Sequence, residues 1–190
     1  MHQNHTNMKQ TIIGTLVGGL LLFIWQFLSW AILDLHRPAQ DYTPKQDSIL
    51  SYLNQHLEKE GGYFLPTVPK GSSADEMQAL EKEMTGKPWA TIQYHSSYDA
   101  NMTSNMVRAL AVNIVILMLL LRIIQKLTTQ TFMEIFALCF LTGIIVFLNT
   151  AYTSHIWYKL FDIRAFLIDS LVMWTLVGLW LGWWMGRKTA

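Results

Sequence analysis

The chain has 190 residues, of which 52% are hydrophobic and only 14% are charged, and its formal net charge is +1. An ordinary soluble domain has about 25% charged residues, so this composition indicates a membrane protein. The near-zero charge provides no broad basic surface, and no nucleic-acid partner is expected. Cys139 is the only cysteine, which excludes an intrachain disulfide and thiol-oxidising chemistry that needs cysteine pairs.

The segment 11–33 contains no formally charged side chain. Because a helix rises about 1.5 Å per residue, roughly 20 apolar residues cross a hydrocarbon core about 30 Å thick. Segments 104–126, 131–151 and 166–186 are similarly apolar. We therefore predict an all-α membrane protein, with four transmembrane helices in a bundle and a small α+β insert between the first and second. The first segment is too long for the apolar core of a cleaved signal peptide, about 7 to 15 residues, and is interpreted as an uncleaved anchor.

Four crossings place both termini on one side of the membrane, and the predicted segments alternate accordingly. In chain order they are a cytoplasmic tail (1–10), helix 1 (11–33), an extracytoplasmic cap (34–103), helix 2 (104–126), a cytoplasmic turn (127–130), helix 3 (131–151), an extracytoplasmic loop (152–165), helix 4 (166–186) and a cytoplasmic tail (187–190). The orientation follows the excess of Lys and Arg over acids on the side of the termini. That side holds Lys9, Arg122, Lys126, Arg187 and Lys188 against Glu134.

The cap is predicted to contain two helices and a strand. Thr43 and Pro44 are expected to start the first helix, which Gly61 and Gly62 end. Ser73 and Glu76 form a capping-box pattern for a second helix that closes at Gly86. Residues 63–69 are expected to be extended, and residues 89–95 alternate as in a strand. About 70 residues without disulfides bury too small a core to be stable alone. We therefore expect the cap to pack against the membrane surface or the helix ends, and the alternative is a mobile loop.

Two glycine stripes are candidates for helix packing. They comprise Gly14 and Gly18 in helix 1, and Gly178, Gly182 and Gly186 in helix 4. Small residues four apart allow close approach of helix backbones in lipid. We expect the two stripes to meet within one chain, while contact with a second copy or with other membrane subunits stays open.

Polar side chains inside membrane helices are candidates for function, because each needs a partner or a water-filled cavity. They are Gln26, Arg108, Asn113, Asn149 and Asp169. On the predicted topology all five lie in the outer half of the membrane. Arg108 and Asp169 lie at similar depth and are expected to form an interhelical ion pair. Two interpretations follow: a satisfied ion pair with a purely structural role, or an outer-leaflet pocket for a small polar ligand or lipid headgroup.

No catalytic or cofactor motif is present, and no catalytic residue, cofactor or metal site is predicted. The sequence lacks His-Glu-x-x-His, a Gly-x-Ser-x-Gly elbow, a phosphate-binding glycine loop and a dinucleotide fingerprint. His36, His56, His95 and His155 lie outside the predicted helices and are interpreted as surface histidines. Together with Met102 and Met106 they leave an extracytoplasmic metal sensor as a weaker hypothesis.

The runs 23–30 (FIWQFLSW), 42–44 (YTP) and 86–89 (GKPW) resemble small four-span bacterial integral membrane proteins for which no activity is known. The resemblance implies a bacterial cytoplasmic membrane and no catalytic residues. The leading functional hypothesis is a non-enzymatic accessory or assembly subunit of a membrane complex. The alternative is a small membrane enzyme or carrier that uses Arg108, Asp169 and the nearby amides.

Overall fold

The computed structural model describes residues 2–99 and 101–186. The chain divides into two compact units. The helical unit contains the chain up to Asp41 and from Asn101 onward, and the insert unit contains residues 42–100. The predicted tail at 187–190 lies outside the described residues.

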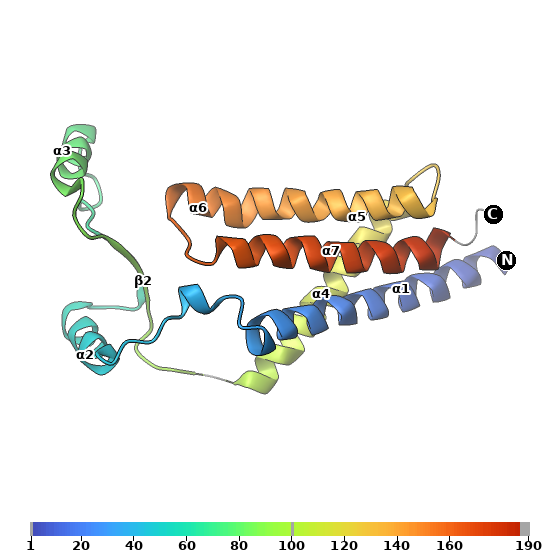
Figure 1. Cartoon of the computed structure of the whole chain (residues 1–190), viewed down its shortest axis with the longest axis horizontal. Coiled ribbons are helices and arrows are strands. Elements are labelled where there is room, and N and C mark those ends of the chain that lie inside the picture. The colour runs from blue at the N-terminus through green and yellow to red at the C-terminus, as the bar shows by residue number, and fades with distance from the viewer. Residues whose placement is uncertain (1, 100, 187–190) are drawn as a thin grey trace. The chain divides into compact units, whose positions relative to one another are not determined.

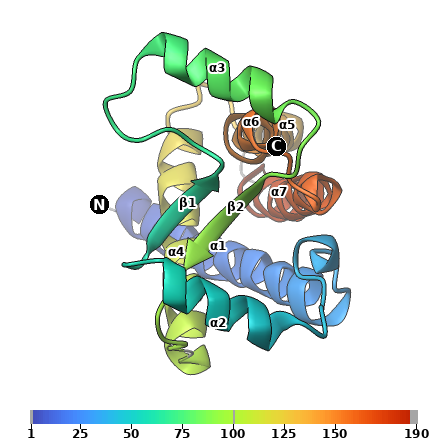
Figure 2. The ribbon, with the colours of Figure 1, turned by 90° about the vertical axis from the view of Figure 1, so that its left-hand side faces the viewer.

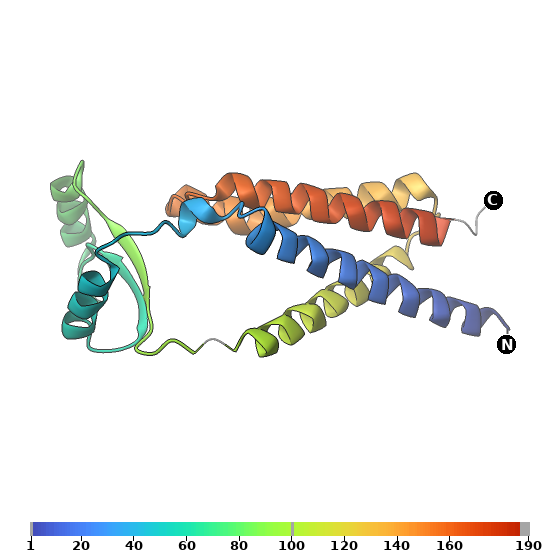
Figure 3. The same ribbon diagram turned by 60° about the horizontal axis from the view of Figure 1, so that its bottom comes forward.

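Within residues 2–99 and 101–186, four helices are long and apolar enough to cross a membrane, which confirms the predicted set. They are α1 (His2–Phe27) continued by the π-helical segment η1 (Leu28–Ile32), α4 (Met102–Ile124), α5 (Phe132–Phe147) continued by η3 (Leu148–Tyr152) and α6 (Thr153–Trp157), and α7 (Ile163–Met185). Helices α1, α5 and α7 run alongside one another, whereas α4 crosses α1 obliquely (Figures 1 and 3). The start of α1 and the end of α7 lie at the same end of this unit (Figure 1).

The helices extend beyond the predicted membrane segments. Helix α1 begins within the predicted tail, α6 continues the third helix into the predicted loop 152–165, and α7 starts at Ile163 rather than 166. Hydropathy marks the part of a helix that matches the hydrocarbon core, whereas backbone hydrogen bonding continues through polar residues. The extra turn before residue 166 places Asp162 at the start of α7.

The core of the helical unit consists mainly of aliphatic side chains, and all four long helices contribute to it, α1 through Leu22. Leu117 and Leu121 of α4, Ile135 of α5, and Val177 and Leu181 of α7 are completely buried. Close packing of such side chains stabilises helix association in lipid through dispersion, because lipid tails are themselves apolar.

The first and fourth long helices, α1 and α7, pack against each other within one chain as expected. Their two glycine stripes do not meet, so that part of the expectation is wrong. Gly14 and Gly18 of α1 face Leu121 and Leu117 of α4 together with tryptophan rings of α7. The α7 stripe instead faces α5, with Gly178 against Phe136 and Cys139, and Gly182 and Gly186 against Phe132. Both stripes are therefore covered within one chain, each by larger side chains of a neighbouring helix.

The insert unit contains two strands and two helices. Strand β1 (Gly61–Leu65) pairs antiparallel with β2 (Ala90–Tyr94), with Gly61 opposite Tyr94 and Leu65 opposite Ala90 (Figure 2). Helix α3 (Ala74–Met84) starts with the predicted capping box, in which Ser73 and Glu76 exchange hydrogen bonds. Helix α2 (Gln46–His56) starts later than predicted, because the Thr43 hydroxyl accepts from the Lys45 amide rather than capping the first turn. Gly61 and Gly62 begin a strand and do not end that helix.

Candidate functional site

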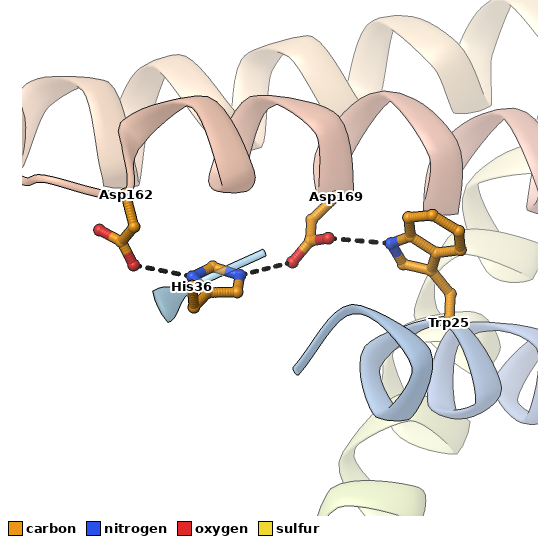
Figure 4. Close-up of polar contacts among 4 residues, drawn as sticks. All are labelled: Trp25, His36, Asp162 and Asp169. Carbon is orange, nitrogen blue, oxygen red and sulfur yellow. Dashed lines mark hydrogen bonds and ion pairs between the residues drawn. The ribbon is translucent and has the colours of Figure 1, made fainter. Parts of the chain in front are cut away.

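A buried histidine is held between two carboxylates at one end of the helical unit. His36 Nδ1 lies 2.7 Å from Asp162 Oδ2, and His36 Nε2 lies 3.0 Å from Asp169 Oδ2 (Figure 4). The Trp25 indole N–H donates to the other oxygen of Asp169 at 3.0 Å. His36 is 1% exposed, and both aspartates are buried. We call these four residues the Asp-His-Asp cluster.

Aromatic rings close the cluster on two sides. The Trp30 ring stacks on the imidazole of His36 with 3.8 Å between ring centroids and an interplanar angle of 7°. Phe166 approaches the same imidazole edge-on, with ring centroids 4.8 Å apart. The rings keep water away from the imidazole, so its hydrogen bonds to the carboxylates act in a low-dielectric environment.

The chain leaving α1 turns back sharply to place His36 against α7. The π-helical segment η1 follows α1, and the Leu35 amide donates to the Ser29 carbonyl at 3.0 Å. Asp34 has a positive φ of 50°, a conformation that aspartate tolerates better than most residues. His36 then caps the short 3-10 helix η2 (Arg37–Ala39). This compact turn fixes the position of the imidazole.

The spacing of the aspartates leaves room for an imidazole with a hydrogen bond at each ring nitrogen. Asp162 caps α7, and Asp169 follows after two helical turns, which returns to nearly the same face about 10 Å further along. The two ring nitrogens of His36 point toward opposite ends of that interval (Figure 4). One imidazole can therefore bond both carboxylates at once.

Two acidic side chains face a single imidazole in the cluster, so the acidic groups outnumber the basic one. The Trp25 indole N–H, which donates to Asp169, adds no charge. A cation would complement this excess of carboxyl groups.

A cavity of about 370 Å³ lies beside Asp169. Its polar wall comes from Gln26, Thr150, Asp169 and Ser170, and its aromatic wall from Trp30, Phe147, Phe166 and Trp174. Residues of both π-helical segments, Trp30 in η1 and Thr150 in η3, contribute to it. Short π-helical segments are frequent at functional sites, and here two of them shape the same cavity.

An amide pair joins α1 to α4 next to this cavity. Gln26 Nε2 donates to Asn113 Oδ1 at 3.4 Å, and Asn113 Nδ2 donates to Gln26 Oε1 at 2.7 Å. Asn113 is completely buried at this contact. The amides therefore satisfy each other, as polar groups within a membrane must.

The structure brings only part of the predicted polar set together. Gln26 and Asp169 line the cavity, and Asn113 reaches it through Gln26. Arg108 and Asn149 are exposed and lie outside the cavity lining. The expected Arg108–Asp169 ion pair is wrong, because Asp169 is buried and bonds His36 and Trp25 instead.

His36, Asp162 and Trp25 are site residues that the sequence reasoning missed. The interpretation of His36 as a surface histidine is wrong. A signal was present in the seven-residue spacing of Asp162 and Asp169, which places both on one helix face if α7 starts early enough. Since both ring nitrogens of His36 face carboxylate oxygens, neither is free to bind a metal in this arrangement.

Comparisons of the chain with protein-family models, curated proteins and solved structures found no match.

Proposed function

We propose that this chain is a four-pass protein of the bacterial cytoplasmic (inner) membrane, with both termini in the cytoplasm and residues 34–103 outside. The apolar helices and the Lys and Arg residues near the helix ends on the side of the termini support this orientation. In this arrangement the Asp-His-Asp cluster lies at the extracytoplasmic end of the helical unit.

The function that the geometry supports best is the binding of a small organic cation in the cavity beside Asp169. The observation that carries this proposal is the buried Asp169, one of two acidic side chains that share a single imidazole, on the wall of a cavity of about 370 Å³. Ligand cavities of small molecules are typically about 300 to 1,000 Å³, lined by apolar side chains with a few converging polar groups. An ammonium group meets both requirements, because it complements the negative charge and fits the volume.

The aromatic wall strengthens the preference for a cation. Trp30, Phe166 and Trp174 present rings to the cavity, and cations are attracted to the faces of such rings within about 6 Å. A free carboxylate ligand would instead meet Asp169 as a like charge. An uncharged solute would gain hydrogen bonds from Gln26 and Thr150 without the electrostatic contribution.

A binding role fits this geometry better than a catalytic one. A histidine that acts as a general base needs one ring nitrogen directed at the proton it removes. In the cluster both nitrogens of His36 are directed at aspartates, so the imidazole positions Asp169 rather than a reacting group. This supports a carrier or receptor for the cation.

The test combines mass spectrometry with ligand titration. The full chain is purified in a gentle detergent, analysed for co-purified molecules, and titrated with butylammonium, butanol and butyrate. We expect binding of butylammonium in preference to the other two. Ala151→Phe fills the cavity from η3 and leaves all four residues of the cluster in place, so it should abolish binding with the fold intact. Arg108→Gln, an exposed control, should bind as the wild type does. Equal binding of all three probes, or binding that survives Ala151→Phe, would refute the proposal.

The accessory-subunit hypothesis has support from the insert unit. Ile49, Leu50 and Tyr52 lie within one turn of α2 and are 48%, 58% and 63% exposed, and contiguous exposed apolar side chains mark interaction surfaces. The same purification distinguishes the two functions, because a stoichiometric foreign subunit supports an accessory role. Association with other membrane subunits, or self-association, stays a prediction.

A further inference from the structure

A second, separate cavity lies between α1 and α4, at the end of the helical unit where α1 begins and α4 ends. This apolar groove has a volume of about 560 Å³. It is independent of the cavity beside Asp169, with which it shares no lining residue. In the proposed orientation it lies in the cytoplasmic half of the membrane.

The groove changes from polar to apolar along its length. Its α1 side includes Met8, Ile12 and Leu16, and its α4 side includes Ile114, Met118 and Arg122. Each trio repeats every four residues, so each follows one helix face for about 12 Å. The two helices run in opposite directions along the groove, so Arg122 lies toward the Met8 end and Ile114 toward the Leu16 end. We call the end of the groove at Arg122 the cationic mouth, and the remainder, from Ile12 and Met118 to Leu16 and Ile114, the apolar furrow.

A smaller polar cavity of about 190 Å³ adjoins the cationic mouth. It shares Thr11 and Gln125 with the groove, and these two side chains are hydrogen-bonded to each other at 2.7 Å. Gln10 and Gln130 provide further amide groups on its wall. Gln10 Nε2 also donates to the Trp184 carbonyl at 3.2 Å. Neutral amide groups, which have donors and acceptors and no charge, suit a hydroxylated group rather than a charged one.

We propose that these two adjoining cavities bind one phospholipid with an anionic, hydroxylated headgroup, such as phosphatidylglycerol. One of the two acyl chains lies in the apolar furrow, the phosphate contacts Arg122 at the mouth, and the hydroxyls of the headgroup glycerol enter the glutamine-lined cavity. The order of the three environments along the cavities matches the order of the three parts of such a lipid. Arg122 supplies the charge complementarity, because guanidinium binds phosphate through parallel hydrogen bonds.

The test is native mass spectrometry of the full chain in detergent, with equimolar phosphatidylglycerol, phosphatidic acid and phosphatidylcholine. We expect phosphatidylglycerol to be retained best and phosphatidylcholine least. Arg122→Gln should lower the retention of phosphatidylglycerol about tenfold, the loss expected for one charge-assisted hydrogen bond. Met118→Trp should block the furrow and lower the retention of all three lipids.

Arg108→Gln is the matched control, because Arg108 is an exposed arginine of the same helix outside the groove. It should retain phosphatidylglycerol as the wild type does. Equal losses in Arg122→Gln and Arg108→Gln, or equal retention of phosphatidylglycerol and phosphatidylcholine, would overturn the site and leave only non-specific annular lipid. Phosphatidic acid retained as well as phosphatidylglycerol would refute the role of the glutamine-lined cavity in binding the headgroup.

Discussion

At the residue scale, the choice of His36 over an arginine as the partner of Asp169 has a physical basis. An imidazole donates from two opposite edges and is flat enough to stack on Trp30. It therefore joins two carboxylates on one helix face while its own faces are covered by aromatic rings. The buried polar residue of α4 is instead Asn113, which pairs with Gln26 and not with Asp169, while Arg108 of the same helix is exposed.

Replacing His36 by phenylalanine tests what the hydrogen bonds of the cluster contribute. His36→Phe keeps a ring against Trp30 but leaves Asp162 and Asp169 buried and facing each other without a donor between them. We expect the free energy of unfolding in mixed micelles to fall by about 3 to 5 kcal/mol, as for other buried ion pairs that lose one partner.

The control for this variant is His56→Phe. His56 is an exposed histidine that also contacts an aromatic ring, Tyr52, and exposed substitutions usually change stability by less than about 0.5 kcal/mol. Equal stability of the two variants would mean that the cluster does not fasten the turn after α1 to α7.

At the element scale, the structure shows which helix packs against each glycine stripe. On α7 the stripe faces α5, so the tightest approach of two helices in the unit depends on glycine rather than on a large apolar side chain. A Cβ built on Gly143 of α5 would lie 2.6 Å from Trp174 Cγ, closer than any real contact. A Cβ on Gly14 would lie at an ordinary 3.4 Å from Leu121.

Alanine substitution should separate these two glycines. Gly143→Ala forces Trp174 away and is expected to destabilise the protein by about 1 to 3 kcal/mol, the usual cost of overpacking a core. Gly14→Ala adds a methyl group at normal contact distance and should change stability by less than about 0.5 kcal/mol. Unfolding of both variants in one detergent provides the comparison, and equal destabilisation would contradict the packing described for α5 and α7.

The capping box of α3 predicts a pH dependence in the insert unit. Hydrogen bonds from the Ser73 amide and hydroxyl lower the pKa of Glu76 from its ordinary value of 4.5. Because the folded-state pKa is the lower one, the contribution of Glu76 to stability is present above about 4.5 and is lost as the pH falls through the lowered value.

Ser73→Ala removes the hydroxyl donor and should raise the pKa of Glu76 toward 4.5, as measured by NMR titration of the full chain. Glu60 provides an internal reference, since hydrogen bonds from Ser96 lower its pKa independently. Its pKa should stay where it is in the wild type. An unchanged pKa of Glu76 in Ser73→Ala would show that the side-chain part of the capping box is unimportant.

The elements were predictable from the sequence to the extent that lipid and local hydrogen bonding dictate them. Apolar length predicts the four helices because only helices and closed barrels satisfy the backbone in a membrane, and Ser73 with Glu76 predicts its helix start locally. The partners of Asp169 and the neighbour of each glycine stripe were not predictable in this way. These contacts depend on which helices are neighbours in the folded unit and on the turn at Asp34. Neither can be inferred from the sequence of one segment alone.

At the scale of the whole molecule, the chain combines a helical unit, whose polar groups are largely satisfied internally, with an insert unit that has little core of its own. Among the described residues of the insert, Tyr94 alone is buried, and its hydroxyl donates to Asn54 at 2.7 Å. About 60 residues with so few buried side chains stabilise themselves weakly. We expect the insert to gain stability from a surface outside itself, which a membrane or a partner subunit would supply.

The proposed topology gives the last prediction. In a Cys139→Ser background, single cysteines replace Ser97 in the insert and Thr128 in the turn between α4 and α5, both exposed. A membrane-impermeant thiol reagent added to intact cells with a permeable outer membrane should label Ser97→Cys and leave Thr128→Cys unlabelled until the inner membrane is opened. Labelling of Thr128→Cys first would reverse the orientation and move the cation cavity to the cytoplasmic end. Labelling of both positions at once would contradict a membrane crossing by α4. Because α4 alone separates residues 97 and 128, the labelling order reports directly on which side of the membrane the insert lies.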